Sequence, residues 1–314
     1  MVCGRAMRIL VTIPHYYDPQ ARASFGSMRP DDGARARALT TQILTLHEHF
    51  GRGQIAINPY SPPPQTVNYF NGTLQNEVKI IVVTEGEKHV LRQISHIAHL
   101  FENIATDRAQ YEPPFLGIKC REVLRGIHRA SPQPFDFYGF MEDDLIIHDP
   151  FFFDKLRFFS QNFGDDCLLQ PNRFELESSG SLEGKRPTPM GLKFYCDGGS
   201  EHLDFSHVHP LMRPSDASEV LTVSVMGRPV KFRRALNPHS GCYFLNPAQM
   251  RMFMEAPYFL EKSAEFIGPL ESAATLGIMK RFIVYKAHAD NANFLEIQHY
   301  DPGILRGIGP ARQR

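Results

Sequence analysis

Two apolar runs of strand length, RILVTIP (8–14) and VKIIVVT (78–84), constrain the fold of this chain more than any other feature. Unbroken apolar runs are typical of strands that are buried on both faces, as in parallel sheets. A third, strongly aromatic run, FDFYGFM, covers 135–141. Apolar residues with helical spacing lie between these runs, at 31–51, 90–101 and 116–128. Strands that alternate with helices predict an α/β fold, with a mixed, mostly parallel sheet flanked by helices.

The second half of the chain is less regular. Residues 175–235 are rich in Gly, Ser, Pro and His, which predicts a long loop insertion. Within it, VLTVSVMGRPVKFRR (220–234) is typical of a hairpin whose turn lies at Gly227. Further strands are expected at 54–58, 167–169 and 281–288, and further helices are expected to begin at Pro247 and near Pro269.

Composition excludes several classes of protein. The 34 basic and 34 acidic side chains balance, so nothing indicates nonspecific nucleic-acid binding. Five scattered cysteines without a C-x-x-C pair favour reduced thiols over a zinc site or a disulfide scaffold. No apolar run is long enough to span a bilayer, and we find no signal peptide. We therefore expect a cytoplasmic protein without a transmembrane segment, and peripheral contact with a membrane stays open.

Three acids, Glu142, Asp143 and Asp144, follow the aromatic run directly. Ligands of parallel sheets bind at the carboxyl ends of the strands, and in an extended chain Glu142 and Asp144 point to the same side. Two such carboxylates suit Mg²⁺ or Mn²⁺ whose remaining ligands are phosphate oxygens. In the alternative interpretation the three acids are solvated turn residues, and Asp149 caps a helix that Pro150 opens.

The segment PFDFYGFMEDDLIIHDPFFF (134–153) resembles the acidic-motif region of the GT-A glycosyltransferases, whose Asp-x-Asp or Glu-x-Asp (DXD) signature follows a hydrophobic strand. The resemblance implies one GT-A-like (Rossmann-like) catalytic domain over 1–314, with a nucleotide-binding half (7–150) and an acceptor-binding half (151–314). It also implies that Asp144 ligates the metal and that Glu142 contacts the metal, its water or the nucleotide. The start of the chain, ILVTIPHYYDP, also resembles the opening of GT-B transferases, but the chain is short for their two domains.

The same resemblance implies a nucleotide pocket beside the first strand. Tyr16 can stack on a base, and Arg35 or Arg37 can reach a diphosphate. Lys119 lies at a helix start, where the dipole disfavours a cation unless an anion binds nearby. The residues expected to contact the nucleotide are Pro14, His15, Tyr16, Arg35, Lys119, Glu142 and Asp143. An exposed basic turn is the plainer interpretation of the arginines.

Other residues are expected to complete the site. Glu271, in the first turn of a helix, is the expected catalytic base, and Glu265 is the fallback. His299 or His288 is expected as a further metal ligand, because the enzymes that the chain resembles often place a histidine near the C-terminus. Of the two, His299 is preferred. The residues expected to bind the donor sugar or the acceptor are Asn172, Arg173, His239, Ser240 and Gly241.

These features predict a metal-dependent glycosyltransferase of polysaccharide or glycoconjugate biosynthesis. Its partners would be a nucleotide-diphosphate sugar and a carbohydrate or glycoconjugate hydroxyl. Inversion is expected, and retention stays open because no residue fixes the stereochemistry. A sugar nucleotidyltransferase is the alternative enzyme, although the Gly-rich basic loop that it needs after the first strand is absent. A non-catalytic protein that binds nucleotide sugars or carbohydrates is the alternative outside catalysis.

Overall fold

A computed structural model describes most of the chain. The described residues are 6–20, 31–51, 54–56, 60, 68–69, 76–107, 112, 115–176, 193–196, 212–235, 238–266 and 268–300. Much of the predicted insertion at 175–235 therefore lies outside the described residues. Among those described, no helix combines the length and the apolar character needed to cross a bilayer.

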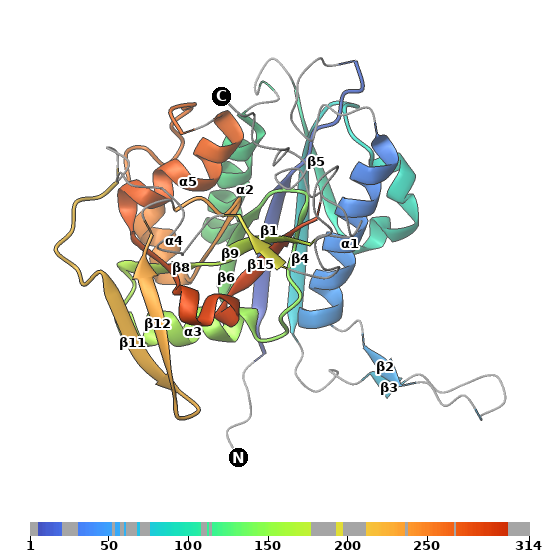
Figure 1. The fold of residues 1–314 in the computed structure, drawn as a ribbon. Helices are drawn as coiled ribbons and strands as arrows, with labels where there is room; N and C mark the ends of the chain where they lie inside the picture. Colours follow the sequence, from blue (N-terminus) through green and yellow to red (C-terminus); the bar gives the residue numbers. More distant parts are fainter. Residues whose placement is uncertain are drawn as a thin grey trace, which may run out of the picture.

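The central sheet has five strands in the order β13-β6-β1-β4-β5. Its strands are β1 (Arg8–Pro14), β4 (Glu77–Glu85), β5 (Glu102–Thr106), β6 (Phe137–Met141) and β13 (Cys242–Leu245). Four of them are parallel, and β13 alone runs antiparallel, beside β6. The predicted α/β class is confirmed, and all three long apolar runs lie in this sheet (Figure 1).

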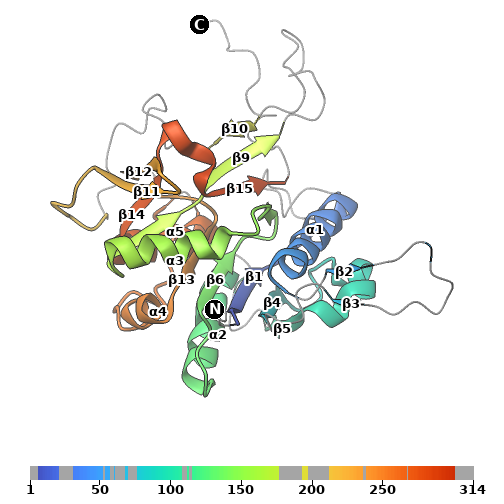
Figure 2. The ribbon, with the colours of Figure 1, turned by 90° about the horizontal axis from the view of Figure 1, so that it is seen from below.

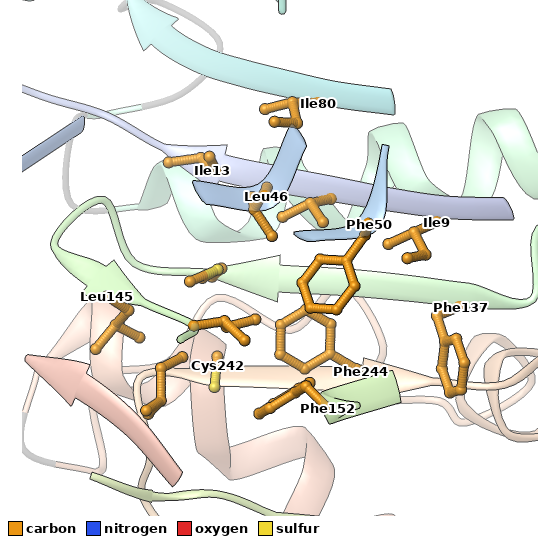
Figure 3. Packing of buried hydrophobic residues seen from close by; sticks show 14 of the residues in the cluster. Ile9, Ile13, Leu46, Phe50, Ile80, Phe137, Leu145, Phe152, Cys242 and Phe244 are labelled. Carbon is orange, nitrogen blue, oxygen red and sulfur yellow. The ribbon is translucent and has the colours of Figure 1, made fainter. Parts of the chain in front are cut away.

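Alternation along the strands divides the core between the two faces of this sheet. Ile9, Val11 and Ile13 of β1 pack with α1, η2 and α3, whereas Leu10 packs with α2, α4 and α5. Figure 2 shows α1 and α3 on one side of the sheet and α2 and α4 on the other. Phe152 and Phe244 belong to the first of these two clusters (Figure 3). Both faces are apolar, which explains why the strands show no polar alternation.

Five α-helices surround the sheets in the described part of the chain. They are α1 (Asp32–Phe50), α2 (Leu116–Ala130), α3 (Phe152–Phe163), α4 (Pro247–Met254) and α5 (Pro269–Arg281). Asp31 accepts a hydrogen bond from the amide of Ala34 and caps α1, as predicted. Asn246 caps α4 with a full capping box.

Two smaller sheets follow the central one. The second has the order β10-β9-β15-β7 and the third β11-β12-β14-β8. Their strands are β7 (Leu145–Ile146), β8 (Cys167–Gln170), β9 (Asn172–Leu176), β10 (Lys193–Tyr195), β11 (Val220–Val225), β12 (Arg228–Arg234), β14 (Ile283–Ala287) and β15 (Glu296–His299). The predicted hairpin at 220–234 is therefore confirmed, and its strand β12 also pairs with β14.

Several local features differ from the predictions. The helix expected at 90–101 is a 3₁₀ helix, η2 (Leu91–Leu100), which is interrupted at Ile94. The expected strand at 54–58 is only β2 (Ile55–Ala56), which pairs with β3 (Asn68–Tyr69) outside the main sheet. Helix α3 begins after Pro150, and Asp149 instead accepts the amide of Phe151 in the turn before it. Strand β9 was not predicted.

Candidate active site

The three acids leave β6 at the carboxyl edge of the central sheet. Antiparallel pairing of β13 with β6 places Cys242 opposite Met141, so the chain before β13 lies against the acids. The carbonyl of Gly241 accepts the amide of Glu142 at 2.9 Å. Gly241 has φ of +66°, and a Cβ on it would lie 2.7 Å from Glu142 Oε2. A glycine is thus required here on two grounds, backbone conformation and close approach.

Asp143 has partners on two other elements. His15, just after β1, places its Nδ1 2.5 Å from Asp143 Oδ2, and Arg35 of α1 also donates to that oxygen. The amide of Val90 donates to His15 Nε2 at 3.2 Å. Because that nitrogen accepts, the proton of a neutral His15 lies on Nδ1, which donates to Asp143. Asp143 therefore joins β1, α1 and the start of η2 to the acidic run.

Asp144 lies between two cationic groups. Its Oδ2 is 3.5 Å from His299 Nε2 and 3.7 Å from Arg35 Nη1. Strand β15 delivers His299 here, because His299 pairs with Leu145 of β7 and the amide of Tyr300 donates to the Asp144 carbonyl. His299 Nδ1 lies 2.7 Å from Glu175 of β9, which fixes the ring. Side chains of the protein thus supply part of the charge that compensates the acids.

Burial and neighbouring charges shift the pKa values of Glu142, Asp144 and His299. Burial, with the charges of Asp144 and Glu271, raises the pKa of Glu142 to about 8, against an opposing effect of Arg173 and His299. Burial alone would raise the pKa of Asp144, but His299, Arg35 and Arg173 hold it well below its usual range. Burial lowers the pKa of His299, yet Asp144 and Glu175 raise it to about 10. At neutral pH Asp144 and His299 are therefore charged, and Glu142 carries a proton.

Two carboxylate oxygens remain without hydrogen bonds. Glu142 Oε1 and Asp144 Oδ1 are buried, and no group in the described part of the chain donates to either. Buried acceptors without donors are costly, and hard cations prefer such oxygens. No cluster of three or more metal-ligating side chains is formed within the described residues. The donor set of two carboxylates, with His299 beside Asp144, nevertheless fits a Mg²⁺ or Mn²⁺ ion that takes its other ligands from phosphate and water.

Helix α5 brings a fourth carboxylate to the acids. Glu271 lies in its first turn, and its charge contributes to the raised pKa of Glu142. His239 is buried and contacts Thr275 of α5 through Nδ1 at 2.9 Å, while its carbonyl accepts from Lys286 at 2.5 Å. The hydroxyl of Ser240 donates to the Pro171 carbonyl. The segment before β13 therefore connects α5 to the acids.

Other predicted residues lie farther from the acids or have internal partners. Lys119 pairs with Glu122 one turn along α2, at 2.6 Å, and Arg37 is exposed on α1. Strand β1 ends at Pro14. Tyr16 follows it, and its hydroxyl donates to Asp18. Asn172 donates to the carbonyls of Ala287 and Ala292, and His288 accepts the amide of Asp290. The fallback base Glu265 is exposed. The roles assigned to these residues stay predictions.

Sequence reasoning missed Glu175 and Gln42. Glu175 is fully buried on β9, a strand that was not predicted. Gln42 donates to the carbonyls of Glu142 and Leu145 and so holds the turn of the acidic run. Its position among Leu39, Ile43 and Leu46 on the apolar face of α1 was the available signal.

Comparisons with known proteins give no family. No protein-family model matches the chain. No curated protein matches it either. Two solved structures are similar to parts of the fold. CMP:2-keto-3-deoxy-manno-octonic acid synthetase complexed with CTP has 12% sequence identity and a TM-score of 0.30, over 81% of this chain and 78% of the other. The apo form of mouse xyloside xylosyltransferase 1 has 13% identity and a TM-score of 0.37, over 94% of this chain and 98% of the other. At these TM-scores the similarity carries no argument about activity.

Proposed function

We propose that the chain is a metal-dependent glycosyltransferase that moves a sugar from a nucleotide-diphosphate sugar to a carbohydrate or glycoconjugate hydroxyl. One observation carries the proposal. Glu142 Oε1 and Asp144 Oδ1 are buried without a donor among the described residues, at the carboxyl edge of a parallel sheet. Sites for nucleotides and their metal ions form at such edges.

Each residue of the site would have its own role in this reaction. Asp144 and Glu142 would hold Mn²⁺ or Mg²⁺, and His299 would be a further ligand after losing the proton on Nε2. The cation, when bound, would neutralise the charge that develops on the departing diphosphate. Arg35 and Arg173, whose charges act on Asp144, would add to that stabilisation. The residues Pro14, His15, Tyr16, Lys119 and Asp143 would surround the nucleotide, and Asn172, His239, Ser240 and Gly241 the sugars.

Glu271 would act as the base of an inverting transfer. It lies in the first turn of α5, and its charge acts on Glu142. The proton of the acceptor hydroxyl would pass to its carboxylate as the oxygen attacks the anomeric carbon and the bond to the diphosphate breaks. Glu265 would remain the alternative base.

Thermal-shift measurements test the proposal. UDP, GDP, ADP and CMP are each added with MnCl₂ or with EDTA. We expect at least one to raise the melting temperature by about 3–5 °C with manganese only, since a ligand that binds the native state stabilises it. Asp144→Ala should abolish this rise, whereas Asp290→Ala, which changes an exposed acid, should keep it. No manganese-dependent rise with any nucleotide contradicts the proposal.

Product analysis separates the alternatives. A glycosyltransferase releases nucleoside diphosphate from a nucleotide sugar, while a sugar nucleotidyltransferase releases pyrophosphate from a nucleoside triphosphate and a sugar phosphate. A binding protein shows manganese-dependent affinity with neither product.

A further inference from the structure

Helix α2 carries a buried cation that the proposed reaction does not use. Arg121 is 2% exposed, and its Cζ lies 5.1 Å from the ring centre of Phe253. Its Nη1 donates to the carbonyl of Phe259 at 3.0 Å, and its Nη2 to that of Ala273 at 2.6 Å. Ala273 lies in α5, two residues after Glu271.

Burying the Arg121 guanidinium between these helices costs free energy that packing alone does not offset. Nε of Arg121 is buried and has no hydrogen-bond acceptor of good geometry within the described parts of the chain, although the Tyr243 hydroxyl interacts with the guanidinium. A buried cation near the first turns of a helix is also opposed by the helix dipole. An apolar side chain of similar volume would often fill such a space with equal or better stability. What the guanidinium adds is a forked hydrogen bond that joins α2 to α5 and to the Phe259 carbonyl.

The same two helices meet almost backbone to backbone. A Cβ on Gly117 of α2 would lie 2.5 Å from the Cβ of Ala273, well inside contact distance. Ala273 is thus fixed from two sides, by the hydrogen bond from Arg121 and by the close approach at Gly117. Two such constraints on one residue leave the first turns of α5 little freedom to slide or rotate.

We infer that Arg121 is a positioning residue that fixes α5 and thereby sets the place of the Glu271 carboxylate relative to Glu142. The inference rests on the proposed function, in which Glu271 is the base. A base must lie within hydrogen-bonding reach of its proton, and a displacement of about 1 Å can cost on the order of 100-fold in rate. Gly117 supports the same contact by admitting Ala273.

Arg121→Met is the first test variant. Turnover is measured as manganese-dependent release of nucleoside diphosphate from UDP-glucose, UDP-N-acetylglucosamine and GDP-mannose, with water or added sugars as acceptor. We expect kcat to fall at least 10-fold while donor affinity stays within 2-fold and the melting temperature stays within a few degrees. Arg121→Lys should recover part of kcat. Wild-type kcat in a folded Arg121→Met protein would overturn the inference.

A paired substitution separates positioning from stability. Gly117→Ala should lower kcat at least 10-fold, because the added methyl group pushes Ala273 away. Gly117→Ala combined with Ala273→Gly restores the space and should regain at least 5-fold, although glycine in a helix destabilises it. Assays run well below each melting temperature. A double variant no more active than Gly117→Ala would contradict the inference.

Hydrogen exchange gives a readout that does not need turnover. Amides of 271–275 should exchange at least 10-fold faster in Arg121→Met and Gly117→Ala, and near the wild-type rate in the double variant. Unchanged exchange in both single variants would overturn the inference even without an assay. Full turnover in Glu271→Gln would instead remove the proposed base, so the two failures are distinguishable.

Discussion

At the scale of single residues, Glu142 combines a stability cost with a proposed ligand role. Its folded pKa of about 8 lies above the unfolded value, so ionisation opposes folding. The resulting penalty is absent below about pH 4.5 and grows as the pH rises toward 8. Such a group is expected where function outweighs stability.

Glu142→Gln should therefore stabilise the protein in EDTA at alkaline pH. We expect a gain of about 1–3 kcal/mol at pH 8–9, because the amide keeps the shape and removes the buried charge. The gain should vanish at pH 4–5, where the wild-type carboxyl is protonated in both states. Melting curves across this range in EDTA measure it. A variant that is less stable than wild type at pH 9 would show that the buried charge is compensated in the metal-free protein.

Asp143 is expected to behave in the opposite way. Asp143→Ala leaves the buried guanidinium of Arg35 without its short contact, and removing one partner of a buried pair costs about 3–5 kcal/mol. Urea unfolding measures this loss. Asp290→Ala breaks the exposed pair with Lys231 and should cost under about 1 kcal/mol. Equal losses in the two variants would contradict the structural role of Asp143.

At the scale of elements, the join between β6 and β13 decides how the acids are held. In Gly241→Ala, alanine would have to adopt a φ of +66°, and its Cβ would clash with the Glu142 carboxylate. We expect a loss of about 2–4 kcal/mol in the free energy of unfolding. The matched control is Gly126→Ala in α2, where an added Cβ meets nothing within 4 Å. That control should gain about 0.5–1 kcal/mol, since alanine favours a helix. A Gly241→Ala protein as stable as wild type would show that the site relaxes.

Elements with long apolar patterns could be predicted from the sequence, and short ones could not. β1 matches its prediction because seven consecutive residues suit a strand buried on both faces. η2 was expected as a helix, but apolar spacing does not show that it is a 3₁₀ helix interrupted at Ile94. β9 was missed because Asn172, Arg173 and Glu175 are polar, and their burial depends on partners far along the chain. The acids could be located in advance, while their neighbours Glu175 and Gln42 required the folded chain.

At the scale of the whole molecule, the predicted nucleotide and acceptor halves share one sheet. β13 comes from the second half and pairs with β6 of the first. We predict a single cooperative unfolding transition for the chain. The absence of tryptophan leaves tyrosine fluorescence and circular dichroism as probes, and their urea curves should coincide. Two separated transitions would indicate halves that fold independently.

The pairings around the acids also dictate when the site can form as the chain is synthesised. Arg35 and Asp143 are 108 residues apart, and Glu175 and His299 are separated by 124. Asp144 leaves the ribosome long before the strand that carries its imidazole neighbour. Contacts between such distant segments close slowly. The contacts of the acidic run with His299 can therefore form only after β15 has been synthesised.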